Sequence, residues 1–196
     1  MNSYIKIKME FQEVLDKRTS VKKFSSKKPS IELIMKAIFS ANMAPSSGNL
    51  NVLRYIIVEE SKIIGKIADA CQQEFIREAP YVVIVCSDLS QLKRMYDIRA
   101  EKYLRHNAGA AVENFLLKIT ELGLGSCWTG AFSESILKNH LNIPENVNIE
   151  VILPVGYEVG KVKTRQRYKQ NLINRVFSNS WGNKYRPFTK VRREDV

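Results

Sequence analysis

The amino-acid sequence predicts one α+β domain spanning residues 1–196. Segments with the period of an amphipathic helix alternate along the chain with short apolar segments rich in β-branched residues. Hydrophobic residues make up 44% of the chain and charged residues 26%, which is an ordinary balance for a globular protein. No internal repeat or low-complexity linker interrupts the 196 residues, so one hydrophobic core is expected.

The helical period appears in six segments: 9–17, 30–44, 61–73, 88–104, 107–122 and 134–141. The second of them has Ser30 as its N-cap, and the apolar stripe expected to face the core is Ile31, Ile34, Met35 and Ile38. Asn107–Leu122 has the clearest pattern, with small residues in its first turns and Gly123 as a left-handed cap. The small residues favour close approach of another helix, either in the same core or in a second subunit.

Three apolar segments are expected to be strands: Val52–Val58, Tyr81–Cys86 and Asn148–Tyr157. Tyr81–Cys86 is apolar throughout, which is typical of a strand covered on both faces. A fourth, shorter strand is expected to start at Ser126 and to run into a turn at Gly130 and Ala131.

Several classes of protein are disfavoured by composition. No apolar run reaches the roughly 20 residues of a membrane span, and the first residues lack the pattern of a signal peptide. The three cysteines are odd in number and widely spaced, so buried thiols and a cytoplasmic location are expected. With two histidines and no metal-ligand spacing, no metal site is expected. Rossmann and P-loop glycine motifs do not occur in the sequence.

The segment Arg18–Phe24 has the residue types of an anion site. On an extended backbone Arg18, Ser20 and Lys22 project to one side, whereas a helix would turn Ser20 away from the two cations. A forked donor, a point charge and a hydroxyl together suit a phosphate group. A solvated basic loop is the alternative interpretation of the same residues.

The net charge of +11 has several possible meanings. A surplus of this size fits a nucleic acid, an anionic membrane surface or a phosphorylated small molecule as partner. Cations occur at every second residue from Lys161 to Lys169, which would place them along one side of an extended backbone. A basic nucleic-acid-binding protein without enzymatic activity is therefore a competing hypothesis, although no nucleic-acid-binding motif accompanies the charge.

Six patterns taken together resemble the nitroreductase family of FMN-dependent oxidoreductases. They are RTSVKKF at 18–24, APSSGN at 44–49, AP-YVVIVC at 79–86, NAGAAVENFLL at 107–117, LGLGSCWTGAF at 122–132 and LPVGY at 153–157. Each pattern is loose alone, but they occur in the family's order and at its spacings. The resemblance covers about residues 10–182.

The resemblance implies a fold and an assembly. The fold is α+β and nitroreductase-like, with a central, mainly antiparallel sheet flanked by helices. The assembly is an intertwined homodimer with two FMN sites at its interface, each built from both subunits. In this arrangement the slender helix at 107–117 has a dimer-face role, and the tail 176–196 wraps around the partner subunit.

The resemblance also implies the residues that bind the cofactor. They are Arg18, Thr19, Ser20, Lys22, Pro45, Ser46, Ser47, Asn49, Thr129, Gly130, Ala131, Arg165 and Arg167. Residues 18–22 would bind the phosphate and the N1/O2 end of the flavin, and the late basic pair would close on the phosphate. Residues 45–49 would come from the partner subunit, and backbone N–H groups at 129–131 would face N5 and O4.

The sequence departs from the family in one motif. The family commonly continues the loop as N-x-Q-P-W, whereas this chain has Asn49-Leu50-Asn51-Val52-Leu53. The side chain of Asn51 offers an amide that can replace part of the missing contacts. Residues 86–107 carry no motif, and the family varies its substrate cover there, so the electron acceptor is not defined by the sequence.

The implied function is that of an FMN-dependent oxidoreductase. Hydride would pass from NADH or NADPH through flavin N5 to a small aromatic acceptor such as a nitroaromatic or a quinone. The scheme needs no side-chain acid or base, so no catalytic residue is expected in the protein. Other branches of the family use the flavin for dehalogenation or for dehydrogenation of peptides, and they remain alternatives.

Overall fold

The computed structural model describes residues 9–160 and 175–184. The chain divides into two compact units, residues 1–163 and residues 164–196, and each unit is described by itself. The prediction of one domain over the whole chain therefore stays a prediction.

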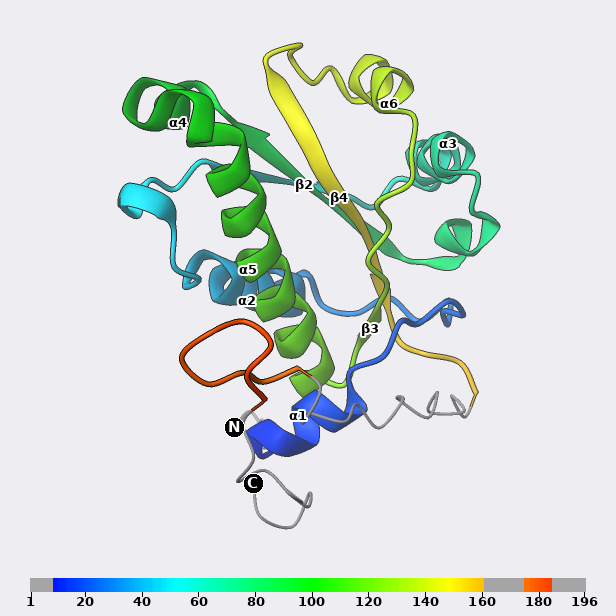
Figure 1. Ribbon diagram of the computed structural model, residues 1–196. Helices are drawn as coiled ribbons and strands as arrows, with labels where there is room; N and C mark the ends of the chain where they lie inside the picture. Colours follow the sequence, from blue (N-terminus) through cyan, green and yellow to red (C-terminus); the bar gives the residue numbers. More distant parts are fainter. Residues whose placement is uncertain (1–8, 161–174, 185–196) are drawn as a thin grey trace. The chain divides into compact units, whose positions relative to one another are not determined.

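The first unit contains a four-stranded sheet with six α-helices around it (Figure 1). The strands are β1 (Leu53–Val58), β2 (Tyr81–Asp88), β3 (Gly125–Ser126) and β4 (Val147–Gly156). The α-helices are α1 (Phe11–Lys17), α2 (Ile31–Asn42), α3 (Ser61–Cys71), α4 (Ser90–Tyr96), α5 (Ala100–Glu121) and α6 (Glu134–Leu141). Three short 3₁₀ turns in this unit are η1 (Ser47–Asn49), η2 (Glu74–Glu78) and η3 (Asp97–Arg99).

The sheet is antiparallel throughout, in the order β1-β2-β4-β3. Ile56, Ile84 and Ile152 lie opposite one another across the three long strands and fix the register. The two central strands β2 and β4 are buried on both faces, as the unbroken apolar sequence of β2 predicts. The predicted α+β fold with an antiparallel sheet and flanking helices is confirmed.

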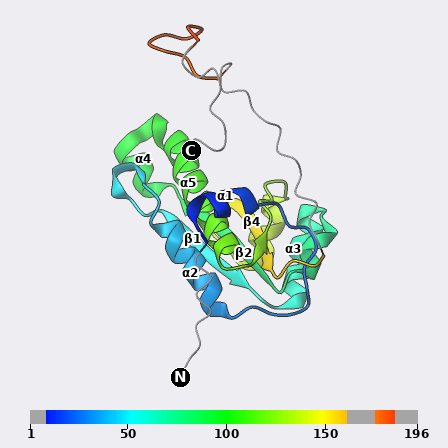
Figure 2. The same cartoon turned by 90° about the horizontal axis from the view of Figure 1, so that it is seen from below.

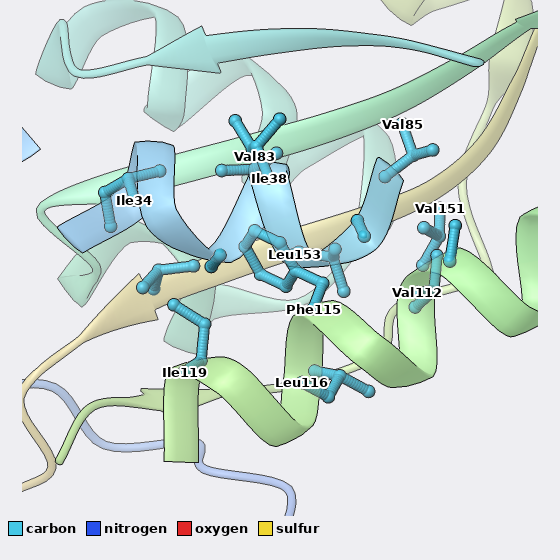
Figure 3. Packing of buried hydrophobic residues seen from close by; sticks show 14 of the residues in the cluster. Ile34, Ile38, Val83, Val85, Val112, Phe115, Leu116, Ile119, Val151 and Leu153 are labelled. Carbon is cyan, nitrogen blue, oxygen red and sulfur yellow. The ribbon is translucent and has the colours of Figure 1, made fainter. Parts of the chain in front are cut away.

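Helices cover both faces of the sheet. On one face α2 and α5 pack their apolar sides against β2 and β4, and Figure 3 shows Ile38, Phe115 and Leu153 meeting in this cluster. On the other face α3 and α6 contribute Ile67 and Leu137 to a second cluster. Figure 2 shows α3 on the far side of the sheet from α2 and α5. The odd and even residues of β2 up to Val85 thus enter separate cores, and a register shift between Val85 and Cys86 places Ile149 of β4 in the second core with Ile152.

Two predictions about helices are wrong in detail. The helix expected over 88–104 ends at Tyr96 and is followed by η3, and residues 100–104 instead begin α5, which was expected to start at Asn107. Ile31 and Met35 were expected to face the core, but both are exposed, and α2 instead buries Ile34, Ala37, Ile38 and Ala41. The exposed side of α2 is also apolar, because it carries Phe39 and Met43 as well.

The two caps predicted from the sequence are confirmed. The Ser30 hydroxyl accepts from the Glu32 N–H at 3.3 Å, as an N-cap does. Gly123 has φ +73°, and it ends α5 as the predicted left-handed residue. Ser133 holds the N-cap position of α6, but its side chain makes no capping hydrogen bond.

The described part of the second unit is a small turn. Phe177 and Lys184 form an isolated antiparallel bridge, and the rings of Phe177 and Trp181 lie 4.8 Å apart. Trp181 is 91% exposed within the described residues. The wrapping of the tail around a partner stays a prediction, because most of the tail lies outside the described residues. Among the described residues, no helix combines the length and the apolar character that crossing a membrane requires.

Candidate cofactor site

The segment after α1 is extended and pairs with the edge of the sheet. The Val21 N–H donates to the Ser126 carbonyl oxygen at 2.9 Å, and Ser20 forms a parallel bridge with Ser126. Val21 is buried, whereas Ser20 and Lys22 on either side of it are exposed. The side chains therefore alternate as the sequence predicts, and the backbone pairing holds Ser20 and Lys22 beside β3.

A close approach of Val21 to Gly125 makes this pairing possible. A Cβ atom at Gly125 would lie 2.6 Å from the Val21 Cγ2 atom, which is closer than any real contact. Gly125 therefore has a steric reason to be glycine, and the segment at residues 18–22 depends on it. We call residues 18–22 together with 125–131 the basic region.

Arg18 has a neighbour that the sequence did not reveal. Its Nε atom lies 3.6 Å from Oε1 of Glu113 on α5. Both side chains are partly exposed, so this ion pair contributes little to stability. It does hold the guanidinium near α5, and an anion at this position would compete with the Glu113 carboxylate.

Polar groups gather around the Cys127 thiol in the basic region. Burial raises the pKa of the Cys127 thiol, while the charge of Lys22 and the hydroxyls of Ser20 and Thr129 act in the opposite direction. The hydroxyl oxygens of Ser126 and Thr129 are buried and have no hydrogen-bond partner among the described residues. Buried hydroxyls without partners are costly, so a polar ligand that satisfied them would be favoured here.

The predicted backbone donors at 129–131 are only partly as expected. The Thr129 N–H donates to the Ile152 carbonyl at 3.0 Å, and the Ile152 N–H donates back at 3.0 Å. The N–H of Thr129 is therefore already bonded to β4. The side-chain hydroxyl of Thr129 is the group that a ligand could still satisfy. Gly130 and Ala131 are exposed, next to the partly exposed Trp128.

The loop at Pro45–Asn49 is held by a residue that the sequence analysis did not assign. Oδ1 of Asn107 on α5 accepts from the Ser47 N–H and from the Ser47 hydroxyl, each at 3.0 Å. A cavity of about 110 Å³ separates this loop from α2 and α5. It is lined by Ala41, Asn42, Ala44, Pro45, Ser46, Asn49, Leu50, Asn51, Val52, Leu53, Asn107 and Ala111. We call residues 45–51 together with Asn107 the amide region.

The two regions lie near opposite ends of α5. Asn107 is in the second turn of this helix, and Gly125 follows its C-terminal end. At about 1.5 Å per residue, Asn107 lies on the order of 20 Å from the C-terminal end of α5, but only about 9 Å from Glu113, which pairs with Arg18. One chain brings Ser20 and Val21 together with Ser126, and it holds the loop at 45–49 on Asn107 of α5.

Two of the predicted site residues, Arg165 and Arg167, lie outside the described residues. Within the described ranges, no three His, Cys, Asp or Glu side chains form a group that could hold a metal ion. Cys71, Cys86 and Cys127 are buried free thiols, as predicted.

The sequence matches the nitroreductase family over residues 15–78 and 67–157. The chain belongs to this family. Among curated relatives, an iodotyrosine deiodinase of Thermotoga neapolitana is 29% identical over 171 residues, which cover 74% of this chain and 87% of that protein. A putative NADH dehydrogenase/NAD(P)H nitroreductase of Archaeoglobus fulgidus is 30% identical over 145 residues, covering 71% of this chain and 80% of that protein.

A solved structure supports the family's fold. An FMN-dependent nitroreductase from Clostridium difficile R20291 superposes with a TM-score of 0.72 at 23% identity, covering 86% of this chain and 98% of that one. At this level of identity the likeness establishes the shared fold. The donors of the basic region, with two buried hydroxyls that lack partners, have the chemistry that the phosphate and polar edge of FMN require.

Proposed function

We propose that this protein is an FMN-dependent oxidoreductase that uses NADH or NADPH to reduce a small aromatic acceptor such as a nitroaromatic or a quinone. The observation that carries the proposal is the basic region of a nitroreductase-family chain. There Lys22, Ser20 and Thr129 lower the pKa of the Cys127 thiol against the effect of burial, and the buried Ser126 hydroxyl lacks a hydrogen-bond partner among the described residues. The Clostridium difficile neighbour named as FMN-dependent adds support.

The chain's own residues would bind and orient the cofactor. Arg18 and Ser20 would hold the phosphate, and Lys22 would place a cation near the N1/O2 edge, where it favours negative charge. The buried hydroxyl of Thr129 would donate or accept at the polar edge of the ring. Bound FMN would supply hydride transfer at N5, so no protein acid or base takes part.

A homodimer is part of this proposal. Because the family resemblance assigns the loop at 45–49 to the partner subunit, a second chain would supply the missing half of each site. The surface that supports this assembly is the apolar side of α2 with α1, where Phe11, Phe39 and Met43 are each 68–69% exposed. Ala111 is buried in its own chain's core, so it is not a dimer-face residue within the described unit.

A second candidate reaction within the same chemistry is reductive dehalogenation of an aromatic substrate. It is favoured by the relative from Thermotoga neapolitana, whose name is iodotyrosine deiodinase. The two candidates share the flavin and differ in the acceptor. A cytoplasmic location is also proposed, since three buried free thiols suit a reducing compartment.

The proposal is tested by absorbance and turnover of the purified protein. We expect a yellow protein with roughly one FMN per chain, because the basic region is proposed to bind this cofactor. Oxidation of NADH or NADPH is then followed with a nitroaromatic, with a quinone and with a halogenated tyrosine. Release of halide assigns the second candidate. Absence of flavin uptake from excess FMN, with salt-sensitive binding to DNA or RNA, would favour the nucleic-acid alternative.

A further inference from the structure

Asn107 is a buried amide of which only one half has a partner. The residue is 5% exposed, and its Oδ1 atom accepts both the N–H and the hydroxyl of Ser47. Its Nδ2 atom is buried without a hydrogen-bond partner among the described residues. Because a backbone N–H can only donate, the contact with Ser47 fixes the oxygen toward the loop and the nitrogen away from it.

The position of Asn107 is unfavourable for helix stability alone. The residue lies inside the 22-residue helix α5, where asparagine is a poorer helix former than the alanines that follow it. A buried N–H without an acceptor adds a further cost. Both costs are explained if the amide serves a ligand in the cavity that Asn107 lines.

The loop is held from its other side by α4. Gly48 has φ +62°, and a Cβ atom there would lie 2.7 Å from the Tyr96 hydroxyl and 2.9 Å from the Met95 sulfur. The rings of Tyr96 and Tyr103 meet edge-to-face at 4.8 Å and join α4 to α5. The loop is therefore packed between α4 and the amide of Asn107, and the two contacts from Ser47 to Oδ1 fix the orientation of that amide.

We propose that Asn107 is a cofactor-positioning residue whose two halves act separately. Its oxygen holds the loop at residues 45–49, and its Nδ2 N–H donates to a neutral acceptor oxygen of the flavin ring bound at that loop. A carbonyl oxygen suits an uncharged amide donor, whereas a phosphate would recruit cations of the kind found in the basic region. The inference rests on the proposed FMN cofactor.

The test is Asn107→Asp in the full-length protein, with FMN affinity measured by fluorescence titration of the apoprotein. Aspartate keeps the oxygen that Ser47 needs and replaces the donor by a second oxygen. We expect FMN binding to weaken about tenfold or more at pH 8 and to recover toward wild type as the pH falls, because a protonated carboxyl can donate again. Asn139→Asp, on the exposed surface of α6, makes the same charge change as a control.

The comparison is made as the ratio of variant to wild-type affinity at each pH. The FMN phosphate and the surrounding side chains of Tyr96, Tyr103 and His106 are the same in both proteins, so the ratio isolates the effect of the substituted side chain. An unchanged affinity, or a loss that does not recover at low pH, would overturn the donor role. If neither wild type nor the Asn139→Asp control binds FMN, the proposed function fails instead.

Discussion

The basic and amide regions are built in opposite ways. The basic region presents cations and hydroxyls from an extended segment that pairs with the edge strand β3. The amide region presents uncharged groups from a loop and a helix around a small cavity. An exposed cationic surface suits a phosphate that keeps part of its hydration, whereas a buried amide suits a flat neutral ring. In the proposed complex the basic region would therefore hold the phosphate and the polar edge of the ring, and the amide region would hold an uncharged part of the ring.

The most disruptive test concerns the separation of the two regions. If a second chain completes each site, Phe39→Glu should abolish both dimer formation and FMN retention, because it places an unpaired charge in an apolar interface. Sedimentation at falling concentration, with flavin absorbance followed in parallel, measures both. Ile136→Glu is the control, since Ile136 is an exposed apolar residue on α6. A Phe39→Glu protein that remains a flavin-containing dimer would contradict the proposed interface.

The next largest effect is expected from the charge of the basic region. A charge-assisted contact contributes about 1.5–3 kcal/mol, so Arg18→Ala should weaken FMN binding by roughly 10- to 150-fold. Glu113→Gln removes the carboxylate that competes for Arg18, and it should leave FMN affinity equal or higher. Titration of each apoprotein with FMN provides the values. If a folded Arg18→Ala variant binds FMN as tightly as wild type, the segment Arg18–Phe24 is a solvated basic loop and not a phosphate site.

The support beneath the basic region can be tested through Gly125. Gly125→Ala forces a Cβ atom against Val21 and should destabilise the protein by about 1–3 kcal/mol. Val21→Ala removes the two methyl groups but leaves the Val21 Cβ atom 2.8 Å from the new Cβ, so the double variant should recover only part of this loss. Chemical denaturation of the four proteins gives the coupling energy. Additive effects of the two substitutions would show that the steric contact does not hold the segment.

The smallest effect is expected at Thr129. Its replacement should stabilise the apoprotein and should weaken the stabilisation that FMN provides. Its hydroxyl is buried without a partner, so Thr129→Val should raise the melting temperature of the apoprotein by about 2–4 °C. The increase in melting temperature on adding FMN should be smaller than in wild type, because the valine cannot bond to the cofactor. A lower apoprotein melting temperature would mean that the hydroxyl already has a partner.

Much of the fold was predictable because the spacing of apolar residues along a segment reflects which of its side chains are buried. The alternation of helices and strands and the fully apolar β2 gave elements close to those observed. The buried side of α2 was not predictable in the same way. Both of its sides are apolar, and a pattern cannot say which of two apolar sides meets the sheet and which remains exposed.

The site was predictable where neighbouring residues form it and not where distant ones do. The alternation of Ser20, Val21 and Lys22 follows from an extended backbone. The contact of Asn107 with Ser47 joins residues far apart in the chain, and no local sequence pattern predicts it. The usable signal was an asparagine directly before the run of small residues at 108–111, where alanine would be the better helix former. The engagement of the Thr129 N–H by β4 likewise depends on the sheet order.

Helix α5 sets which parts of this chain can change length during evolution. It carries Asn107 for one region and Glu113 for the other, and the chain turns into β3 soon after its end. Inserting or deleting one residue between these points would rotate everything beyond by about 100° and turn one contact away. Insertions before Ala100, around α4 and η3, would leave the relative directions of these contacts unchanged. Relatives that differ in substrate should therefore vary in length before α5 and keep its length constant.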